Sequence, residues 1–296
     1  MAITEREFIL DKTRYLEFSH LMAEVLGETP AASAPLLPAW HWLFTHETPL
    51  GVKLGVDGHP KVRPWGVPEH FVRRLWTDSV IECGKVAVDF GQPLLLRTEV
   101  GRAILKQGKS GEMAFVPIEL SLSDGDTVVL EERRTGVYRP ASGPSGKPAI
   151  VCRTNEKLDE ATLPVMKSIS FSEVDLFRYS AMLKVYHRVH YDAAYATGEE
   201  GHRGLLVHGP LLAQVLIGRA LRSHPGFRAG RIAVKVHRPT YVNSTTLLCV
   251  ELDDAVNLIR ATALNEQRFP VMTIQLIGVQ RGAVCFLYLM GYFPVS

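Results

Sequence analysis

The sequence predicts an α+β protein in which buried helices pack against an antiparallel sheet, and three observations support this fold class. Strand-like runs separated by short loops fill much of both halves of the 296-residue chain, and loops this short join antiparallel neighbours. The segment Pro210–Arg222 is apolar around most of a helical circumference, so a sheet must cover it. A Pro/Gly/Ser cluster lies near the midpoint, and at roughly 150 residues per domain the length fits two units.

The first predicted element is a helix over Thr4–Leu26. Thr4 and Glu7 have the spacing of a capping box, in which two side chains satisfy free N–H groups at the start of a helix. Three later segments combine apolar residues of high β propensity with alternating polar ones, and this pattern predicts strands. These segments of the first half are residues 93–105, 112–122 and 127–139.

Residues 138–148 read YRPASGPSGKP, and this cluster predicts a linker over residues 141–164. The linker divides the chain into an amino-terminal domain, residues 1–140, and a carboxy-terminal domain, residues 165–296.

An internal match suggests that the two domains arose by duplication. Lys85–Pro93 and Arg231–Pro239 superpose with a shift of 146 residues, and three of the nine positions are identical. Chance similarity between two alternating strands is the alternative. The agreement of the shift with the linker position favours duplication.

The second half begins with the predicted buried helix and continues as strands. Pro210 suits the first turn of a helix because its missing N–H would have no partner there. Gln214, Gly218 and Arg222 recur every four residues as one narrow polar stripe, and the remaining positions are mostly apolar. The predicted strands that follow are residues 231–236, 245–252, 257–265, 270–280 and 283–293.

Composition excludes several classes of protein. The 33 basic and 31 acidic side chains give a net charge of +2, which does not favour nucleic-acid binding. No apolar run approaches the ~20 residues that span a bilayer, and the charged start MAITEREF is unlike a secretory signal. The four cysteines form no CxxC pair, so we expect reduced thiols in a cytoplasmic protein rather than a zinc or redox site.

A set of short motifs follows in order along nearly the whole chain. In the first half they are Trp40-His41-Trp42, LGVDGHP at 54–60, RRLW at 73–76, GKSGEMAFV at 108–116 and LEERRTGVYR at 130–139. In the second half they are FSEVDLFRYSA at 171–181, HRVHYDAAYA at 187–196 and GLLVHGPL at 204–211. Together they resemble the MaoC-like dehydratases of the hydroxyacyl-thioester dehydratase type 2 group.

This resemblance implies a double hotdog, in which a central helix is wrapped by a curved antiparallel sheet twice over. It also implies a hydro-lyase that hydrates enoyl thioesters or dehydrates 3-hydroxyacyl thioesters carried by coenzyme A or an acyl carrier protein. The expected enzyme needs no cofactor and no metal. Its working site would lie in the carboxy-terminal domain, the amino-terminal domain would shape the acyl tunnel, and the chain would be a monomer or a homodimer.

Two residues are the candidates for catalysis. His190 matches the position of the family's catalytic histidine, and an ordinary imidazole pKa of ~6.5 suits the exchange of a proton with water. Gly209 precedes Pro210 and so lies at a helix start, where N–H groups are free and the helix dipole is positive. A thioester carbonyl can approach such an N–H closely because glycine has no side chain. Gly209 is therefore the expected oxyanion donor.

One position departs from the family pattern. Hotdog hydratases have an acidic residue or Asn five positions before the histidine, and this chain has Val185, which can neither hold water nor move a proton. Tyr186, His187 and Asp192 are candidate substitutes within the substrate-binding segment. His208 either orients the substrate or is a buried structural histidine.

The departure leaves two other functions open. The chain could be a repurposed hotdog that isomerises, cyclises or cleaves a thioester, or a protein that binds acyl thioesters without turnover. His187-x-x-His190-x-Asp192 also contains the residue types of an iron site, although the resemblance supplies a metal-free account. GxSxG, P-loop and GxGxxG motifs are not found, so hydrolase, nucleotide-hydrolase and Rossmann functions have no support.

Overall fold

The computed structural model describes residues 2–29, 38–46, 48–84, 88–108, 111–141 and 163–279. The strands are β1 (Ala2–Ile9), β2 (Arg73–Cys83), β3 (Pro93–Val100), β4 (Ile104–Gly108), β5 (Gly111–Asp124), β6 (Thr127–Arg139), β7 (Lys167–Ile169), β8 (Ala229–Val236), β9 (Thr246–Asp253), β10 (Leu258–Asn265) and β11 (Pro270–Gly278). The helices are α1 (Lys12–Leu26), α2 (Trp42–Thr45), α3 (Glu173–Leu183), α4 (Ala193–Gly198) and α5 (Gly209–Ser223), with 3₁₀ turns η1 (Gly51–Lys53) and η2 (Arg188–His190).

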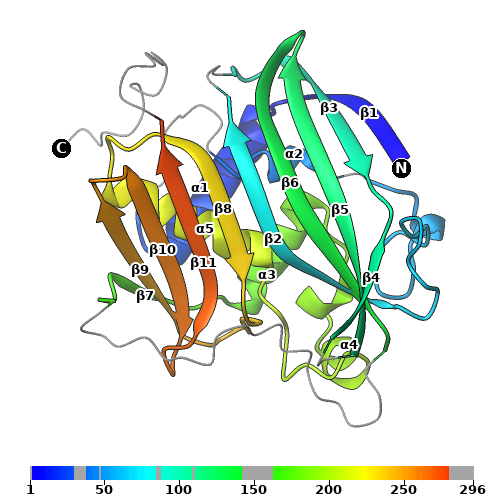
Figure 1. Ribbon diagram of the computed structural model, residues 1–296. Helices are drawn as coiled ribbons and strands as arrows, with labels where there is room; N and C mark the ends of the chain where they lie inside the picture. Colours follow the sequence, from blue (N-terminus) through cyan, green and yellow to red (C-terminus); the bar gives the residue numbers. More distant parts are fainter. Residues whose placement is uncertain are drawn as a thin grey trace.

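The strands form one antiparallel sheet in the order β1-β3-β5-β6-β2-β8-β11-β10-β9-β7, with β4 beside β5. Figure 1 shows helices α1, α3 and α5 on one face of this sheet. The predicted α+β fold class is confirmed, and the architecture is the double hotdog that the resemblance implied.

The two halves of the sheet meet where β2 pairs with β8. Ile81 of β2 lies opposite Ile232 of β8, and both side chains are completely buried. Burial of paired apolar side chains at the centre of the sheet makes it continuous from one half to the other. The helices of both halves therefore share one core.

Both halves place their strands in the same spatial order. The amino-terminal half runs β1-β3-β5-β6-β2 and the carboxy-terminal half runs β7-β9-β10-β11-β8 when read towards the junction. In each half the helices are inserted between the first and second strands. This shared order supports duplication. The domain boundary stays a prediction, because residues 142–162 of the expected linker lie outside the described ranges.

The sequence match that suggested duplication was wrong in detail. Arg231–Val236 lies in β8, whereas Val88–Gln92 leads through a turn into β3, and residues 85–87 lie outside the described ranges. By place in the sheet, the counterpart of β8 is β2. Two segments with a similar alternation of apolar and polar residues therefore have different places in the fold.

The predicted helix over Thr4–Leu26 was also wrong in its first part. Ala2–Ile9 is the edge strand β1, which pairs with β3 along its whole length. The helix starts at Lys12 instead, because the Asp11 carboxylate accepts a hydrogen bond from the Arg14 N–H at 2.9 Å. The Thr4-x-x-Glu7 spacing of a capping box is thus coincidental.

The strand predictions hold with two changes. Residues 93–105 divide into β3 and the hairpin strand β4, and β2 is a long strand that the sequence analysis did not identify. The segment 283–293 lies outside the described residues. Cys83 and Cys249 are free thiols in β2 and β9.

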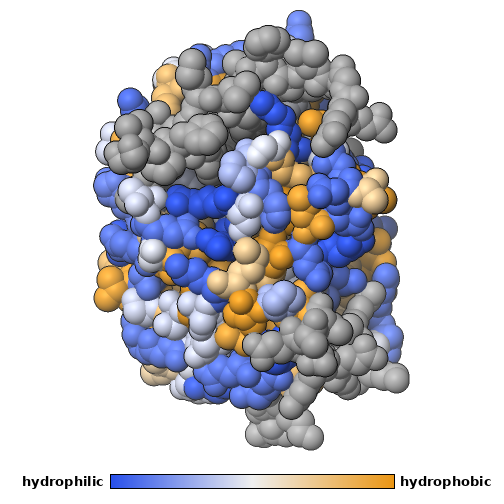
Figure 2. Space-filling model, turned by 90° about the vertical axis from the view of Figure 1, so that its left-hand side faces the viewer, coloured by the Kyte–Doolittle hydropathy of each residue, from blue (hydrophilic) through white to orange (hydrophobic). Residues whose placement is uncertain are grey.

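Within the described ranges, no helix combines the length and apolarity needed to span a membrane. Figure 2 shows one face of the molecule, on which a band of apolar groups is flanked by hydrophilic ones.

The buried helix is confirmed as α5, with nearly the bounds predicted for it. Leu211, Leu212, Val215 and Leu216 are each at most 2% exposed, and α5 packs on strands β9, β10 and β11. The predicted polar stripe is also buried at Gln214. Its side-chain N–H donates to the Ala39 carbonyl at 2.9 Å, and its carbonyl accepts from the Tyr179 hydroxyl at 2.8 Å.

Replacing Gln214 tests this buried link between the halves. Gln214→Ala leaves the buried Tyr179 hydroxyl without its hydrogen-bond acceptor, and the Ala39 carbonyl keeps only the longer bond from the Trp42 N–H at 3.4 Å. We therefore expect a loss of about 1–3 kcal/mol in the free energy of unfolding. Urea denaturation measures it. Gln267→Ala, on an exposed turn, is the matched control and is expected to stay within about 0.5 kcal/mol of the parent protein. Equal stability of the two variants would contradict the account.

Candidate functional site

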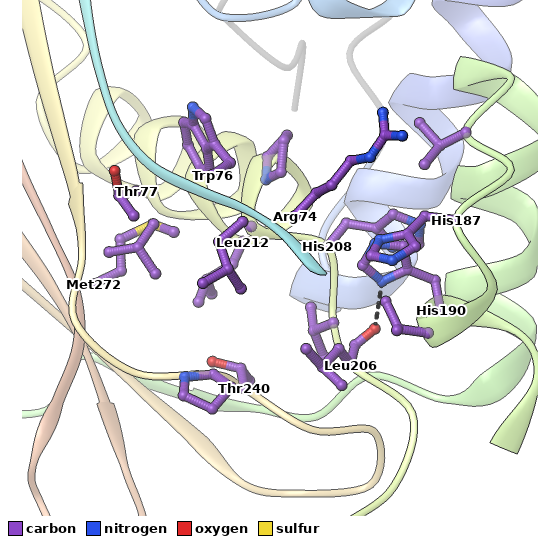
Figure 3. A pocket seen from close by; sticks show the side chains of 18 of the residues that line it. Arg74, Trp76, Thr77, His187, His190, Leu206, His208, Leu212, Thr240 and Met272 are labelled. Carbon is purple, nitrogen blue, oxygen red and sulfur yellow. Dashed lines mark hydrogen bonds between the residues drawn. The ribbon is translucent and has the colours of Figure 1, made fainter. Parts of the chain in front are cut away.

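A cavity of about 370 Å³ lies at the amino-terminal end of α5, between the two halves of the molecule. Its wall combines Trp42 and Trp76 of the first half with His190, Gly209 and Leu212 of the second. Figure 3 shows these surroundings, with His187, His190 and His208 gathered at one side of the cavity. The junction of β2 with β8 therefore also assembles the cavity.

His190 ends η2 and presents one free ring nitrogen. Its Nδ1 lies 2.8 Å from the Leu206 carbonyl oxygen. A carbonyl can only accept, so Nδ1 carries the hydrogen and Nε2 keeps its lone pair. Burial, followed by the charge of the nearby His187, lowers the pKa of His190 to about 3, although the hydrogen bond to Leu206 opposes the shift. His190 is therefore a neutral base at neutral pH.

Gly209 is the first residue of α5, and its N–H is among those that no helical carbonyl can reach. A Cβ placed on it would lie 2.7 Å from Cε3 of Trp76, which is closer than real contacts allow. Only glycine lets the Trp76 ring pack against the helix start. The free N–H groups and the positive end of the α5 dipole therefore favour negative charge at this position.

His208 links His190 to the start of α5. Its ring stacks on that of His190, with centroids 3.7 Å apart and an interplanar angle of 19°. Its Nε2 lies 2.8 Å from the Ser180 hydroxyl, and burial followed by the charge of His190 keeps its pKa well below the ordinary value. Because His208 directly precedes Gly209, this stacking places His190 beside the start of α5.

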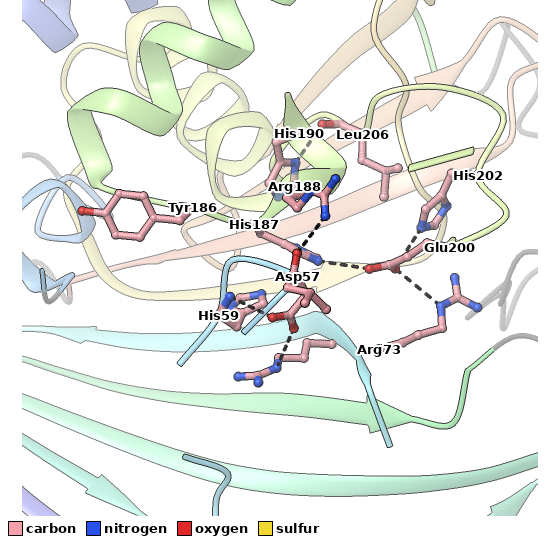
Figure 4. Close-up of polar contacts among 12 residues, drawn as sticks. Asp57, His59, Arg73, Tyr186, His187, Arg188, His190, Glu200, His202 and Leu206 are labelled. Carbon is pink, nitrogen blue, oxygen red and sulfur yellow. Dashed lines mark hydrogen bonds and ion pairs between the residues drawn. The ribbon is translucent and has the colours of Figure 1, made fainter. Parts of the chain in front are cut away.

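Val185 and its three proposed substitutes, Tyr186, His187 and Asp192, differ in whether they reach the cavity. Val185 and His187 line the cavity, and Tyr186 and Asp192 do not. The Asp192 carboxylate caps α4 through the Tyr195 N–H at 2.9 Å and pairs with Arg188 at 2.7 Å. Figure 4 shows the Tyr186 ring directed away from the histidines. The roles of Tyr186 and Asp192 in binding substrate therefore have no geometric support.

Glu200 anchors His187 and joins the two halves. Its carboxylate lies 3.3 Å from Nε2 of His187, 3.5 Å from Nε2 of His202 and 3.5 Å from Nε of Arg73 on β2. Burial alone would raise the pKa of Glu200, but the two histidine hydrogen bonds and the Arg73 charge outweigh it and lower the pKa. The ionised carboxylate requires a hydrogen on Nε2 of His187, which fixes how that ring is held.

The loop of residues 54–60 brings one further histidine to the cavity, which the sequence analysis had not singled out. His59 lines the cavity, and its ring centroid lies 4.4 Å from that of His187. Burial, together with His187 and Arg74, lowers its pKa well below 6.5. The LGVDGHP motif was noted only as part of a resemblance. Its spacing along the chain, about 130 residues from His190, could not show that it reaches the site.

Gly58 lets this loop dock on the segment before η2. Its φ is +85°, and a Cβ there would lie 1.7 Å from the Tyr186 carbonyl oxygen. The docked loop is held by the Arg188 N–H, which donates to the Asp57 carbonyl at 3.0 Å, and by the Asp57–Arg74 ion pair at 3.4 Å. Figure 4 shows these contacts between the loop and residues 187–190.

The iron-site hypothesis gains no support from this arrangement. Among the described residues, no group of three or more His, Cys, Asp or Glu side chains is placed to hold a metal ion. Asp192, one member of the hypothetical set, is occupied by Arg188 and the start of α4.

The chain is similar in sequence to known hydratases and dehydratases. A sequence profile of the family "Hydroxyacyl-thioester dehydratase type 2" matches residues 39–242. Over 195 residues, 66% of this chain and 67% of the relative, the sequence is 32% identical to mesaconyl-C(4)-CoA hydratase of Chloroflexus aurantiacus. It is 23% identical over 266 residues to the mitochondrial hydroxyacyl-thioester dehydratase type 2 of Schizosaccharomyces pombe, covering 81% of this chain and 86% of that one.

Solved structures with the same fold are more distant in sequence. HtdX of Mycobacterium tuberculosis superposes with a TM-score of 0.67 at 15% identity, over 94% of this chain and 100% of that one. A MaoC-like dehydratase from Phytophthora capsici gives 0.64 at 15% identity, over 95% of this chain and 96% of that one. These likenesses bear on the fold alone.

Substitution at Gly58 tests whether the docked loop belongs to the site. We expect Gly58→Ala to displace the loop and to lower kcat/KM at least about tenfold, because a small misplacement of binding groups is costly. Gly91→Ala is the matched control, since Gly91 has a φ of +86° but open space around its Cβ position. Steady-state kinetics on folded protein distinguishes them. Parallel behaviour of both variants would show that backbone strain alone is responsible.

Proposed function

Because this chain belongs to the hydroxyacyl-thioester dehydratase type 2 family, we propose that His190 and Gly209 carry its reaction. The chain is an acyl-thioester hydratase or dehydratase, a hydro-lyase. The observation that supports this site is the stacking of His190 on His208, which places a neutral base beside the free N–H groups of α5. The substrate is a thioester of coenzyme A or of an acyl carrier protein.

In the hydration direction, the oxygen of a water molecule bonds to the β-carbon of the enoyl thioester. One proton of that water passes to Nε2 of His190, and the electrons of the double bond move onto the thioester oxygen as an enolate. The α-carbon then takes the proton from His190, which restores the neutral imidazole. Dehydration is the same sequence in reverse.

The N–H of Gly209 stabilises the enolate oxygen. One such donor contributes ~3 kcal/mol to transition-state stabilisation when it is fixed before the reaction. The surrounding apolar wall strengthens this interaction because it excludes water. The α5 dipole acts in the same direction.

His187 is the proposed substitute for the polar residue that Val185 replaces. Of Tyr186, His187 and Asp192, it alone lines the cavity. Its Nε2 is engaged by Glu200, so Nδ1 remains to contact water or substrate. The Val185→Asn variant tests this assignment, because a gain in hydration rate would show that His187 fills the place only partly.

The compartment and the oligomeric state are part of the proposal. The free thiols of Cys83 and Cys249 support a reducing compartment, and we propose the cytoplasm. A monomer or a homodimer fits a chain that already contains paired hotdogs.

Loss of the proposed base, His190, should greatly reduce turnover. We expect His190→Ala to lower kcat by about 10³-fold, the typical contribution of a general base. Loss of enoyl absorbance with a panel of enoyl-CoA substrates measures the rate. His20→Ala, exposed on α1, is the control and should keep the parent rate. Full activity in His190→Ala would remove the proposed mechanism.

The lowered pKa of His190 predicts an unusual pH profile. The base is protonated only near pH 3, so kcat/KM should stay nearly constant from pH 8 to about pH 5. The unfolded chain binds a proton at an ordinary pKa of ~6.5, so this histidine's contribution to stability is full above that pH and declines as pH falls. Circular dichroism at each pH separates unfolding from titration. A half-loss near pH 6.5 in folded protein would contradict the assignment.

A further inference from the structure

The cavity wall holds one histidine that the proposed mechanism does not use. Besides His59, the described histidines that line the cavity are His46, His187, His190, His202, His208 and His237. Each of these six has a ring nitrogen within 3.5 Å of an oxygen of another described residue. For His59, no hydrogen bond or ion pair joins either ring nitrogen to another described residue, although its main chain bonds to Asp57 and Gly55. The His59 ring is therefore available to a ligand in the cavity.

Both ring nitrogens of His59 are open to the cavity. Nδ1 of His202 and Nδ1 of His208 are buried without a hydrogen-bond partner, so a molecule in the cavity does not reach them. Neither nitrogen of His59 is sealed in this way. A water molecule or a substrate atom can therefore approach the His59 ring.

The His59 ring is fixed before any substrate binds. Its loop docks on the segment before η2 through Gly58, and the Asp57 contacts described above hold it there. The ring packs on that of His187 with centroids 4.4 Å apart, and the centroid of His187 lies 5.4 Å from that of His190. Figure 4 shows His59 on the same side of the molecule as these two rings. A group held in place in this way loses little entropy when it contacts a substrate.

The reaction needs a hydrogen-bond donor at the β-carbon. Hydroxide is a poor leaving group, so a departing hydroxyl oxygen must be met by hydrogens as its negative charge develops. Val185 has no polar hydrogen to offer. His190 donates its Nδ1–H to the Leu206 carbonyl, so its Nε2 can only accept. His187 directs its Nε2–H at Glu200, so Nδ1 of the neutral ring is likewise an acceptor.

His59 can supply this donor. Burial first, and then the charges of His187 and Arg74, keep its pKa well below the ordinary value, so the ring is neutral. The charge of His190 also contributes to this lowering, so the two rings lie close enough to interact. A neutral imidazole has one N–H donor and one acceptor nitrogen. The donor of His59, unlike those of His187 and His190, is not used by another described residue.

We propose that the His59 N–H binds the oxygen atom that is added to the β-carbon in hydration and lost from it in dehydration. This inference rests on the proposed function, because it takes His190 as the base. In dehydration, His190 takes the α-proton to give the enolate. The thioester carbonyl then re-forms, the α–β double bond forms, and the bond from the β-carbon to the hydroxyl oxygen breaks. His190 returns the proton to that oxygen, which leaves as water, while His59 donates a hydrogen bond and keeps its own hydrogen.

Elimination of two different leaving groups tests the proposal. 3-Hydroxybutyryl-CoA and 3-chlorobutyryl-CoA have the same acyl chain and carrier, but chloride leaves without needing a proton. We expect His59→Phe, which keeps a ring without nitrogens, to lower hydroxyl elimination roughly 100-fold and to change chloride elimination less than about threefold. Formation of the enoyl absorbance measures both reactions. The control is His70→Phe, at an exposed position before β2, which should keep both parent rates.

Three further variants separate the hydrogen bond from packing. His59→Leu is measured in parallel as a second variant without a nitrogen, so that misfolding of one variant does not decide the result. His59→Asn and His59→Gln each keep an N–H, and at least one of them should recover part of the lost hydroxyl elimination. Melting temperatures confirm that each variant is folded.

Each other outcome overturns the proposal. An equal loss of both eliminations in His59→Phe and His59→Leu would show that the ring only keeps the cavity in shape. The parent rate of hydroxyl elimination in these variants, or recovery in neither amide variant, would show that no donor at this position contacts the leaving oxygen. His190→Ala tests the proposed function separately, because loss of the base should slow both eliminations. A parent protein that eliminates neither group, or His190→Ala with both parent rates, would remove the proposed function itself.

Discussion

The pairing of β2 with β8 is the interaction on which the rest of the molecule depends. It turns two half-sheets into one, and it places the Trp76 ring of the first half against Gly209 of the second. The same strand carries Arg73 to Glu200 and Arg74 to Asp57, so the loop of residues 54–60 and the histidine segment are fixed from one element. The amino-terminal half is thus a structural part of the site.

Burial sets the chemical character of the site. Histidines packed against one another and away from water stay neutral, because desolvation and each other's charge both disfavour the imidazolium form. A neutral His190 can accept a proton from water, which an imidazolium cannot. Glu200, by contrast, is an ionised carboxylate although its exposure is only 4%. It remains charged because His187, His202 and Arg73 surround it.

Sequence reasoning succeeded where one local pattern decides the structure. The apolar circumference of residues 210–222 has no solution other than a covered helix. The two residues proposed for catalysis, His190 and Gly209, both line one cavity, and their roles stay a prediction. The helix predicted from Thr4 was wrong in its first part. Thr4 and Glu7 have the spacing of a capping box, but this segment is a strand because it pairs with β3. Sequence reasoning also did not single out His59, which was quoted only within the LGVDGHP motif. The proximity of His59 to the cavity depends on contacts between the two halves that no local spacing encodes.

The central claim is that one thioester contacts both the Gly209 N–H and the His190 base. A crystal structure with an unreactive acyl-pantetheine analogue tests it most directly. The account predicts the thioester oxygen about 3 Å from the Gly209 nitrogen, with the β-carbon on the side of Nε2 of His190 and room for one water between them. An analogue that binds with its carbonyl turned away from α5, or outside this cavity, would contradict it.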